Sequence, residues 1–105
     1  MNKFENVVIF GASQGIGKAL AMEYISAGSK LVILSRNAAQ TKLLSEEITA
    51  DGGKCYYQTC DITSTESVKS GIIFAAEKLG KIDLVIINSG VGGPNWMESF
   101  SSKQF

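Results

Sequence analysis

Residues 7–20 of the 105-residue chain read VVIFGASQGIGKAL, and this stretch decides the fold. The four apolar residues Val7–Phe10 are typical of a strand that is buried on both faces. Three glycines follow, Gly11, Gly15 and Gly17, and a helical pattern of apolar residues then begins. A strand, a glycine-rich turn and a helix in this order predict the first unit of an α/β fold.

Three further segments are expected to be strands. Leu31–Leu34 and Leu84–Ile87 are short, apolar and rich in branched residues. The segment Cys55–Cys60 (CYYQTC) is more polar, which suits a strand at the edge of a sheet. Because helical patterns separate these segments, we expect the strands to pair in parallel.

Helical spacing of apolar residues fills the gaps between the expected strands. The first helix is expected to begin near Ile16 and to stop at Gly28, and a second lies between the second and third strands. The third is expected to start with a capping box formed by Thr63 and Glu66 and to end at Gly80. Together they predict a single domain over residues 1–105: an α/β, Rossmann-like doubly wound parallel sheet of about four strands and three helices.

The composition fits a globular protein with a buried core, since 45% of the residues are hydrophobic and 19% are charged. Ten basic and ten acidic residues give zero formal net charge, so we expect no nucleic-acid or anionic-membrane partner.

The first apolar run is too short for a signal peptide, which favours a cytoplasmic location. Histidine is absent, so we expect no metal site. Cys55 and Cys60 would lie roughly 16 Å apart on one strand, too far for a disulfide.

The three glycines have the context of a phosphate-binding loop, because backbone N–H groups and a helix N-terminus meet there. They fit neither standard fingerprint. The pattern G-x-G-x-x-G needs a small residue where Leu20 stands, and the P-loop needs Ser or Thr where Ala19 follows Lys18. A close-packed corner between strand and helix therefore stays open as an alternative. We interpret Lys18 as a solvated helix residue rather than a phosphate ligand.

The second strand is followed by Ser35-Arg36-Asn37, where dinucleotide-binding folds place the group that reads the adenosine ribose. An Asp or Glu there would accept a hydrogen bond from a free 2′-hydroxyl, and neither is present. The Arg36 guanidinium could instead bind a 2′-phosphate through two charge-assisted hydrogen bonds. This pattern favours NADP(H) over NAD(H), and a solvated loop arginine is the alternative.

These motifs together resemble those of the short-chain dehydrogenase/reductase family. GASQGIG is similar to the family's Thr-Gly-x-x-x-Gly-Ile-Gly loop, and SRN, CDIT and IDLVIINSGVGGP follow in family order between residues 7 and 94. The sequence departs from the family at Phe10, where Thr is usual. Ile87 and Ser89 replace an Asn and an Ala, and Gln14 stands where some NADP-preferring members carry a basic residue.

The resemblance implies roles for the residues of these motifs. The glycine loop would hold the pyrophosphate and the adenosine phosphate, and the segment at Asn88 would bracket the cofactor ribose. Asp61 would place its carboxylate near the adenine amino group, with a purely structural turn as the alternative. The cofactor-binding residues implied in this way are Gly11, Ser13, Gln14, Gly15, Ile16, Gly17, Ser35, Arg36, Asn37, Asp61, Ile62, Asn88, Ser89 and Gly90.

The resemblance also implies hydride transfer between nicotinamide and a carbonyl or alcohol, catalysed by a Tyr-x-x-x-Lys segment. No tyrosine of this chain is followed by lysine four residues later. The family would place that segment beyond residue 105. We therefore expect a truncated chain without catalytic residues, inactive by itself, and the substrate stays open. The alternative is a non-catalytic nucleotide-binding or oligomerisation module.

The family order of strands, 3-2-1-4, has an implication for the last strand. Leu84–Ile87 would form an apolar edge without a partner, and such edges promote self-association. This predicts a homo-oligomer. Trp96, Met97 and Phe100 lie in the following segment, which either covers that edge or lies at the substrate mouth.

Overall fold

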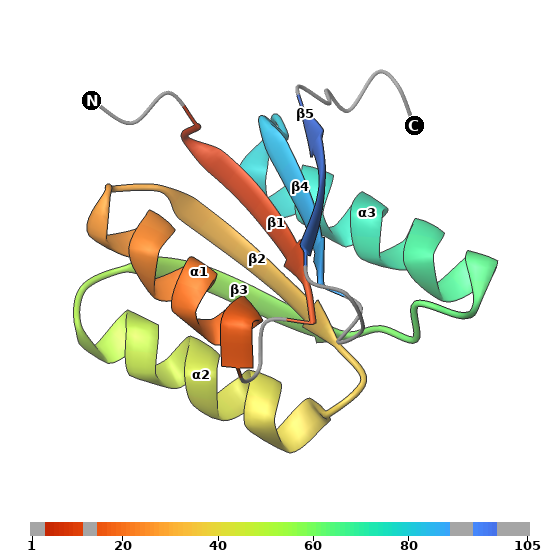
Figure 1. The fold of residues 1–105 in the computed structure, drawn as a ribbon, viewed down its shortest axis with the longest axis horizontal. Coiled ribbons are helices and arrows are strands. Elements are labelled where there is room, and N and C mark those ends of the chain that lie inside the picture. The colour runs from red at the N-terminus through yellow and green to blue at the C-terminus, as the bar shows by residue number, and fades with distance from the viewer. Residues whose placement is uncertain (1–3, 12–14, 89–93, 99–105) are drawn as a thin grey trace.

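The computed structural model describes residues 4–11 and 15–88, together with the backbone of residues 94–98. Strands and helices alternate as far as the fourth strand, and a fifth strand follows it (Figure 1). Each expected strand and helix is present. The elements are β1 Asn6–Phe10, α1 Gly15–Ser26, β2 Lys30–Ser35, α2 Ala38–Ala50, β3 Lys54–Thr59, α3 Thr65–Leu79, β4 Leu84–Asn88 and β5 Pro94–Glu98.

The sheet has the order β3-β2-β1-β4-β5, and the first four of these strands are parallel. Helices α1 and α2 cover one face of the sheet, and α3 covers the other (Figure 1). The predicted Rossmann-like sheet with strand order 3-2-1-4 is thereby confirmed. β3 lies at one edge, as its polar sequence predicted.

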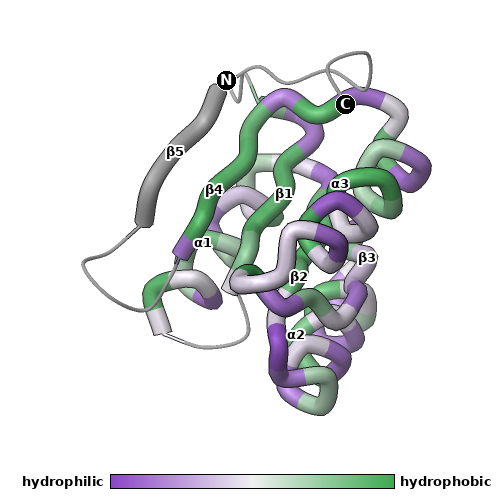
Figure 2. Tube along the Cα trace, turned by 90° about the vertical axis from the view of Figure 1, so that its right-hand side faces the viewer, coloured by the Kyte–Doolittle hydropathy of each residue, from purple (hydrophilic) through white to green (hydrophobic). Residues whose placement is uncertain are grey.

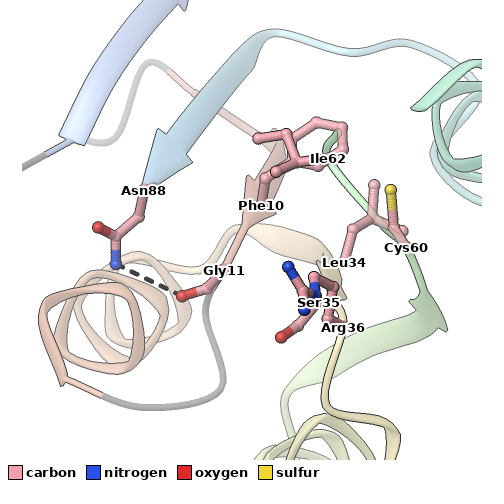
Figure 3. Close-up of a pocket in the computed structure, with 8 residues that line it drawn as sticks. All are labelled: Phe10, Gly11, Leu34, Ser35, Arg36, Cys60, Ile62 and Asn88. Atoms are coloured by element: carbon pink, nitrogen blue, oxygen red, sulfur yellow. Dashed lines mark hydrogen bonds between the residues drawn. The ribbon is translucent and has the colours of Figure 1, made fainter. Parts of the chain in front are cut away.

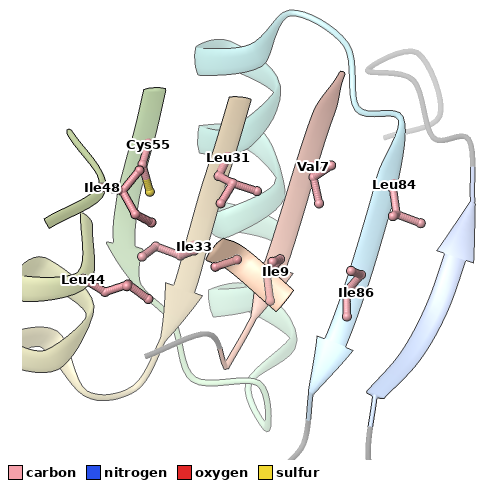
Figure 4. Close-up of a cluster of buried hydrophobic side chains, with 10 residues drawn as sticks. Val7, Ile9, Leu31, Ile33, Leu44, Ile48, Cys55, Leu84 and Ile86 are labelled. Atoms are coloured by element: carbon pink, nitrogen blue, oxygen red, sulfur yellow. The ribbon is translucent and has the colours of Figure 1, made fainter. Parts of the chain in front are cut away.

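Successive side chains of each strand point to opposite faces of the sheet, and this divides the core into two halves. In β1, Val7 and Ile9 pack with α1 and α2, whereas Val8 and Phe10 pack with α3. Figure 4 shows the first half, in which side chains of β1, β2 and β4 line up beside α2. Because both faces are covered, the central strands are continuously hydrophobic (Figure 2). Each fully buried Ile or Leu stabilises the fold by roughly 1.5–3 kcal/mol.

One expectation about the sheet is wrong: β4 is not an edge strand. β5 pairs with it in antiparallel register, with Leu84 opposite Glu98. The segment that carries Trp96 and Met97 therefore covers the β4 edge, while Phe100 lies outside the described residues. The sequence PNWME gave little sign of a strand because it begins with proline and lacks an apolar run. Self-association through the β4 edge loses its physical basis.

The start of α3 also differs from the expectation. Ser64, not Thr63, is the N-cap, and its Oγ accepts a hydrogen bond from the Ser67 N–H at 3.2 Å. Both residue types can cap, and here the Thr63 hydroxyl instead donates to the Asp61 carboxylate at 2.7 Å. The helix ends are as predicted, since Gly28 and Gly80 follow α1 and α3 with φ of 94° and 78°.

The two cysteines are buried free thiols. Burial raises the pKa of the Cys55 thiol to about 11, against a smaller opposing effect of a hydrogen bond with Ser45. Cys55 is thus protonated at neutral pH and acts as a small apolar residue beneath α2. In the part of the chain that the structure describes, no helix combines the length and apolar character needed to cross a membrane.

Candidate functional site

A cleft of about 190 Å³ lies where the carboxyl ends of the parallel strands meet (Figure 3). In an open parallel α/β sheet this is the edge at which ligands bind. β1, β2 and β4 contribute residues at their ends, and the segments directly after β1, β2 and β3 contribute the rest. The residues that line it are Phe10, Gly11, Leu34, Ser35, Arg36, Cys60, Ile62 and Asn88.

Gly11 directly follows β1 in a conformation that only glycine adopts readily, with φ of 83°. Its N–H donates to the Leu34 carbonyl at 2.6 Å, and its carbonyl accepts a hydrogen bond of 3.4 Å from Asn88 Nδ2 (Figure 3). A Cβ at this position would collide with the Asn88 carbonyl oxygen. The close approach of β1 and β4 at the cleft therefore requires a glycine here.

Helix α1 begins beside Gly11. Gly15 is its first residue, with φ of 64°; Ile16 is exposed, and Gly17 is buried. Lys18 lies on the outer side of the helix, where its Nζ is 3.8 Å from the Glu47 carboxylate and both side chains are about half exposed. This position fits the interpretation of Lys18 as a solvated helix residue. Ser13 and Gln14 lie outside the described residues.

The segment after β2 presents a cation to the cleft. Arg36 is exposed and lines the cleft, and among the described residues its guanidinium makes no hydrogen bond or close ion pair. The flanking residues hold it in place: the Ser35 carbonyl accepts from the Cys60 N–H at 2.9 Å, and Asn37 is the N-cap of α2. Asn37 Oδ1 accepts from the Gln40 N–H at 2.9 Å, so this predicted cofactor residue has a structural task.

The segment after β3 presents an anion next to that cation. Asp61 is exposed and lies in the sequence between the lining residues Cys60 and Ile62. Hydrogen bonds from the side chain and the backbone of Thr63 hold the pKa of the Asp61 carboxyl below its usual value, and the charge of Arg36 adds to this effect. The carboxylate is therefore ionised throughout the neutral range. Its bond to Thr63 also makes the turn that the sequence left open as an alternative.

The structure brings five of the predicted site residues together around one cleft. They are Gly11, Ser35, Arg36, Ile62 and Asn88. Asp61 lies between two lining residues, the start of α1 follows Gly11, and Ser89 and Gly90 are outside the described residues.

Sequence reasoning missed three lining residues, Phe10, Leu34 and Cys60. Each lies at or directly after the carboxyl end of a strand. Their position in the expected strands was the one available signal, because their side-chain chemistry is that of ordinary core residues.

The cleft combines apolar walls with one cationic group, Arg36, and the backbone at Gly11 allows a ligand to approach closely. Such a site can bind a molecule that has a planar apolar part and a phosphate. Among the residues that the structure describes, no three His, Cys, Asp or Glu side chains gather to hold a metal ion. The chain also contains no Tyr-x-x-x-Lys segment.

Comparison with known proteins assigns this fold to a family. A family model described as short chain dehydrogenase matches residues 5–105. The chain belongs to the short-chain dehydrogenase family. The match extends over β1 to β5 and includes every described residue of the cleft.

Curated short-chain dehydrogenases are similar over most of this chain. The 7alpha-hydroxysteroid dehydrogenase of Escherichia coli (strain K12) is 39% identical over 87 residues, which make up 83% of this chain and 34% of that protein. The human Short-chain dehydrogenase/reductase 3 is 36% identical over 97 residues, or 90% of this chain and 32% of that protein. The chain thus spans about a third of the length of these relatives.

Solved structures of the family superpose on the same region. The crystal structure of hydroxysteroid dehydrogenase from Escherichia coli matches with a TM-score of 0.75 at 34% identity, covering 84% of this chain and 39% of that one. A 7 alpha-hydroxysteroid dehydrogenase complexed with NADH and 7-oxo glycochenodeoxycholic acid matches with a TM-score of 0.73 at 36% identity. It covers 76% of this chain and 32% of that one.

Proposed function

We propose that this chain is the NADP(H)-binding N-terminal portion of a short-chain dehydrogenase/reductase. In the whole protein, hydride would pass between the nicotinamide and a carbonyl or alcohol. The observation that carries the proposal is the cleft at the strand ends, where Gly11 permits close backbone approach and the Arg36 guanidinium has no hydrogen-bond partner among the described residues. The NADH in a related solved structure supports a nicotinamide dinucleotide as the ligand class.

The geometry supports a division of roles along the cleft. Gly11 and the start of α1 would receive the pyrophosphate, because Gly11 lets the backbone approach closely and the positive end of the α1 dipole, with the N–H groups of its first turn, lies there. Asp61 and Ile62 would border the adenine, as a hydrogen-bond acceptor and an apolar wall respectively. Asn88, held by its bond to the Gly11 carbonyl, would bracket the ribose at the end of β4.

The preference for NADP(H) rests on the end of β2. Ser35 stands where an acid would be needed to read a free 2′-hydroxyl, and Arg36 beside it can bind a 2′-phosphate. The planar guanidinium forms two parallel hydrogen bonds with a phosphate, which a hydroxyl cannot match. We therefore expect the extra phosphate of NADPH to strengthen binding.

Titration of the chain with NADPH and with NADH tests this proposal. We expect tighter binding of NADPH and a loss of at least about tenfold in its affinity in Arg36→Ala, with NADH affinity unchanged. Lys54→Ala is the matched control, because Lys54 is an exposed cation at the opposite end of the sheet. Equal affinities for the two cofactors, unaffected by Arg36→Ala, would overturn the NADP assignment.

The competing function is a non-catalytic nucleotide-binding module. The same cleft would serve it, so cofactor binding does not separate the two. A reading frame that continues into a Tyr-x-x-x-Lys segment would decide for the oxidoreductase.

We further propose a cytoplasmic location, which the two free thiols support.

A further inference from the structure

The strand β3 forms one edge of the sheet, and part of its backbone faces away from β2 (Figure 4). The Cys60 N–H, directly after the strand, donates to the Ser35 carbonyl of β2 at 2.9 Å. Backbone groups of successive residues in a strand point to alternate sides. Every second residue therefore bonds to β2, and the N–H and carbonyl groups of Cys55, Tyr57 and Thr59 point outward.

Helix α2 reaches only the start of this outer edge. Ser45 Oγ donates to the Cys55 carbonyl at 3.2 Å, and a carbonyl oxygen has a second lone pair with which to accept another bond. Farther along the strand, Tyr57 and Thr59 are exposed. Within the described residues, no hydrogen bond from outside the sheet reaches their backbone. The edge thus offers unpaired backbone donors and acceptors.

The sequence of β3 lacks the features that protect the edge of a sheet from pairing. Such features are a proline, a bulge or a charge within the strand. The strand KCYYQT has no proline and no charge after Lys54, and it pairs with β2 residue by residue without a bulge. At the opposite edge, β5 begins with Pro94 and ends with Glu98. Of these two edges, β3 is the one open to a further strand.

We propose that β3 pairs with β3 of a second copy of this chain, in antiparallel orientation about a two-fold axis at Tyr57. Only outward-facing residues can form the hydrogen-bonded pairs of the new ladder. The register that uses all of them places Tyr57 opposite Tyr57 of the second copy, and Cys55 opposite Thr59. Because both copies present the same surface, this pairing closes as a dimer.

The charges at the two ends of β3 complement each other in this dimer. Lys54 begins the strand, Asp61 follows its end, and both are exposed. Among the described residues, no close ion pair uses either side chain. The antiparallel register brings Lys54 of each copy within one residue of Asp61 of the other, whereas parallel pairing would place the two lysines side by side. The zero net charge of the chain leaves no overall repulsion between copies.

Sedimentation over a range of protein concentrations tests the dimer. We expect a monomer–dimer equilibrium in the unmodified chain. Tyr57→Pro removes an outward N–H and no bond to β2, so it should weaken the dimer at least about tenfold with an unchanged circular dichroism spectrum. Tyr57→Phe is the matched control and should dimerise normally. Monomers at every concentration in the unmodified chain, or undiminished dimerisation in Tyr57→Pro, would overturn the proposal.

Charge reversal tests the antiparallel register. Lys54→Glu and Asp61→Lys should each weaken the dimer about tenfold, because each replaces two attractions by two repulsions, and the double variant should restore it. Lys69→Glu makes the same charge change at an exposed position of α3 and should have no effect. A double variant that dimerises no better than the single variants, or assemblies larger than two copies, would overturn the proposed pairing.

Discussion

The two ends of the parallel sheet both carry a cavity, and they differ in what their polar groups do. At the amino ends of β2 and β3 the cavity is the larger one, about 270 Å³ against about 190 Å³. Ser29, which lines it, is used for structure, because its Oγ donates to the Phe4 carbonyl at 2.7 Å, and the side chains of Lys30 and Lys54 line it as well. Nearby, the Asp83 carboxylate accepts from the backbone N–H groups of Glu5 and Asn6 at 3.1 and 2.9 Å.

At the carboxyl ends of the strands, charged side chains still have atoms that can form hydrogen bonds with a ligand. Arg36 makes no hydrogen bond within the described residues, and Asp61 offers one carboxylate oxygen to solvent. Helix α1 also begins at this end. Because lysines also line the amino-end cavity, neither charge nor cavity volume alone marks the binding end; the close backbone approach at Gly11 and the start of α1 do.

The largest effect is expected at Gly11. Gly11→Ala adds a Cβ that collides with the Asn88 carbonyl and forces alanine into a positive φ, so we expect a loss of about 3 kcal/mol or more in unfolding free energy. NADPH binding should be lost as well. Urea denaturation and cofactor titration measure the two effects.

Gly28→Ala is the control for this substitution at the opposite end of the sheet. Gly28 lines the amino-end cavity, has a similar φ of 94°, and has no atom within 4 Å of an added Cβ. This variant should lose only about 1–2 kcal/mol in unfolding free energy, because the positive φ is its one source of strain, and it should keep its cofactor affinity. Equal losses in the two variants would contradict the close approach of β1 and β4.

A smaller effect is expected at Asp83, which joins the start of β1 to the start of β4. Asp83→Ala removes the acceptor of two backbone hydrogen bonds and should cost about 1–2 kcal/mol in unfolding free energy, with NADPH affinity unchanged. Glu46→Ala, an exposed acid on α2, should leave the stability nearly unaltered. Weakened cofactor binding in Asp83→Ala would show that the amino end is not purely structural.

The smallest effect is expected at Lys18. Its ion pair with Glu47 is exposed, so Lys18→Ala should change the unfolding free energy by less than about 0.5 kcal/mol. Cofactor affinity should also stay the same, because the side chain points toward α2 rather than into the cleft. A loss of about tenfold in NADPH affinity would instead identify Lys18 as a phosphate ligand.

The sequence predicted the parallel sheet well because its signals are local. Runs such as Val7–Phe10 and Leu31–Leu34 are short, apolar and rich in branched residues, as buried strands are, and the carboxyl ends of parallel strands share one edge of the sheet. Gly11 and Arg36 follow two of these runs, the resemblance to the family added Asn88, and all three line one cleft in the structure. The residues beside the strand ends were therefore predictable as a group.

The features that the sequence did not predict depend on which of two roles, or which of two similar neighbouring residues, the fold uses. Thr63 and Ser64 are both good caps, and only the fold decides that Ser64 caps α3 while Thr63 binds Asp61. Asn37 could contact a ligand or cap a helix, and here it caps α2. β5 has no apolar run of its own, so nothing in its sequence predicted that it would pair with β4.

NMR mapping of NADPH binding on the isotope-labelled chain tests the central claim most directly, because it reads both ends of the sheet in one titration. The account predicts that backbone signals of Gly11, Arg36 and Asp61 shift with NADPH, while those of Ser29 and Gly52 at the amino-end cavity stay in place. Shifts confined to Ser29 and Gly52, or no shifts at saturating NADPH, would contradict the assignment of the strand-end cleft as the cofactor site.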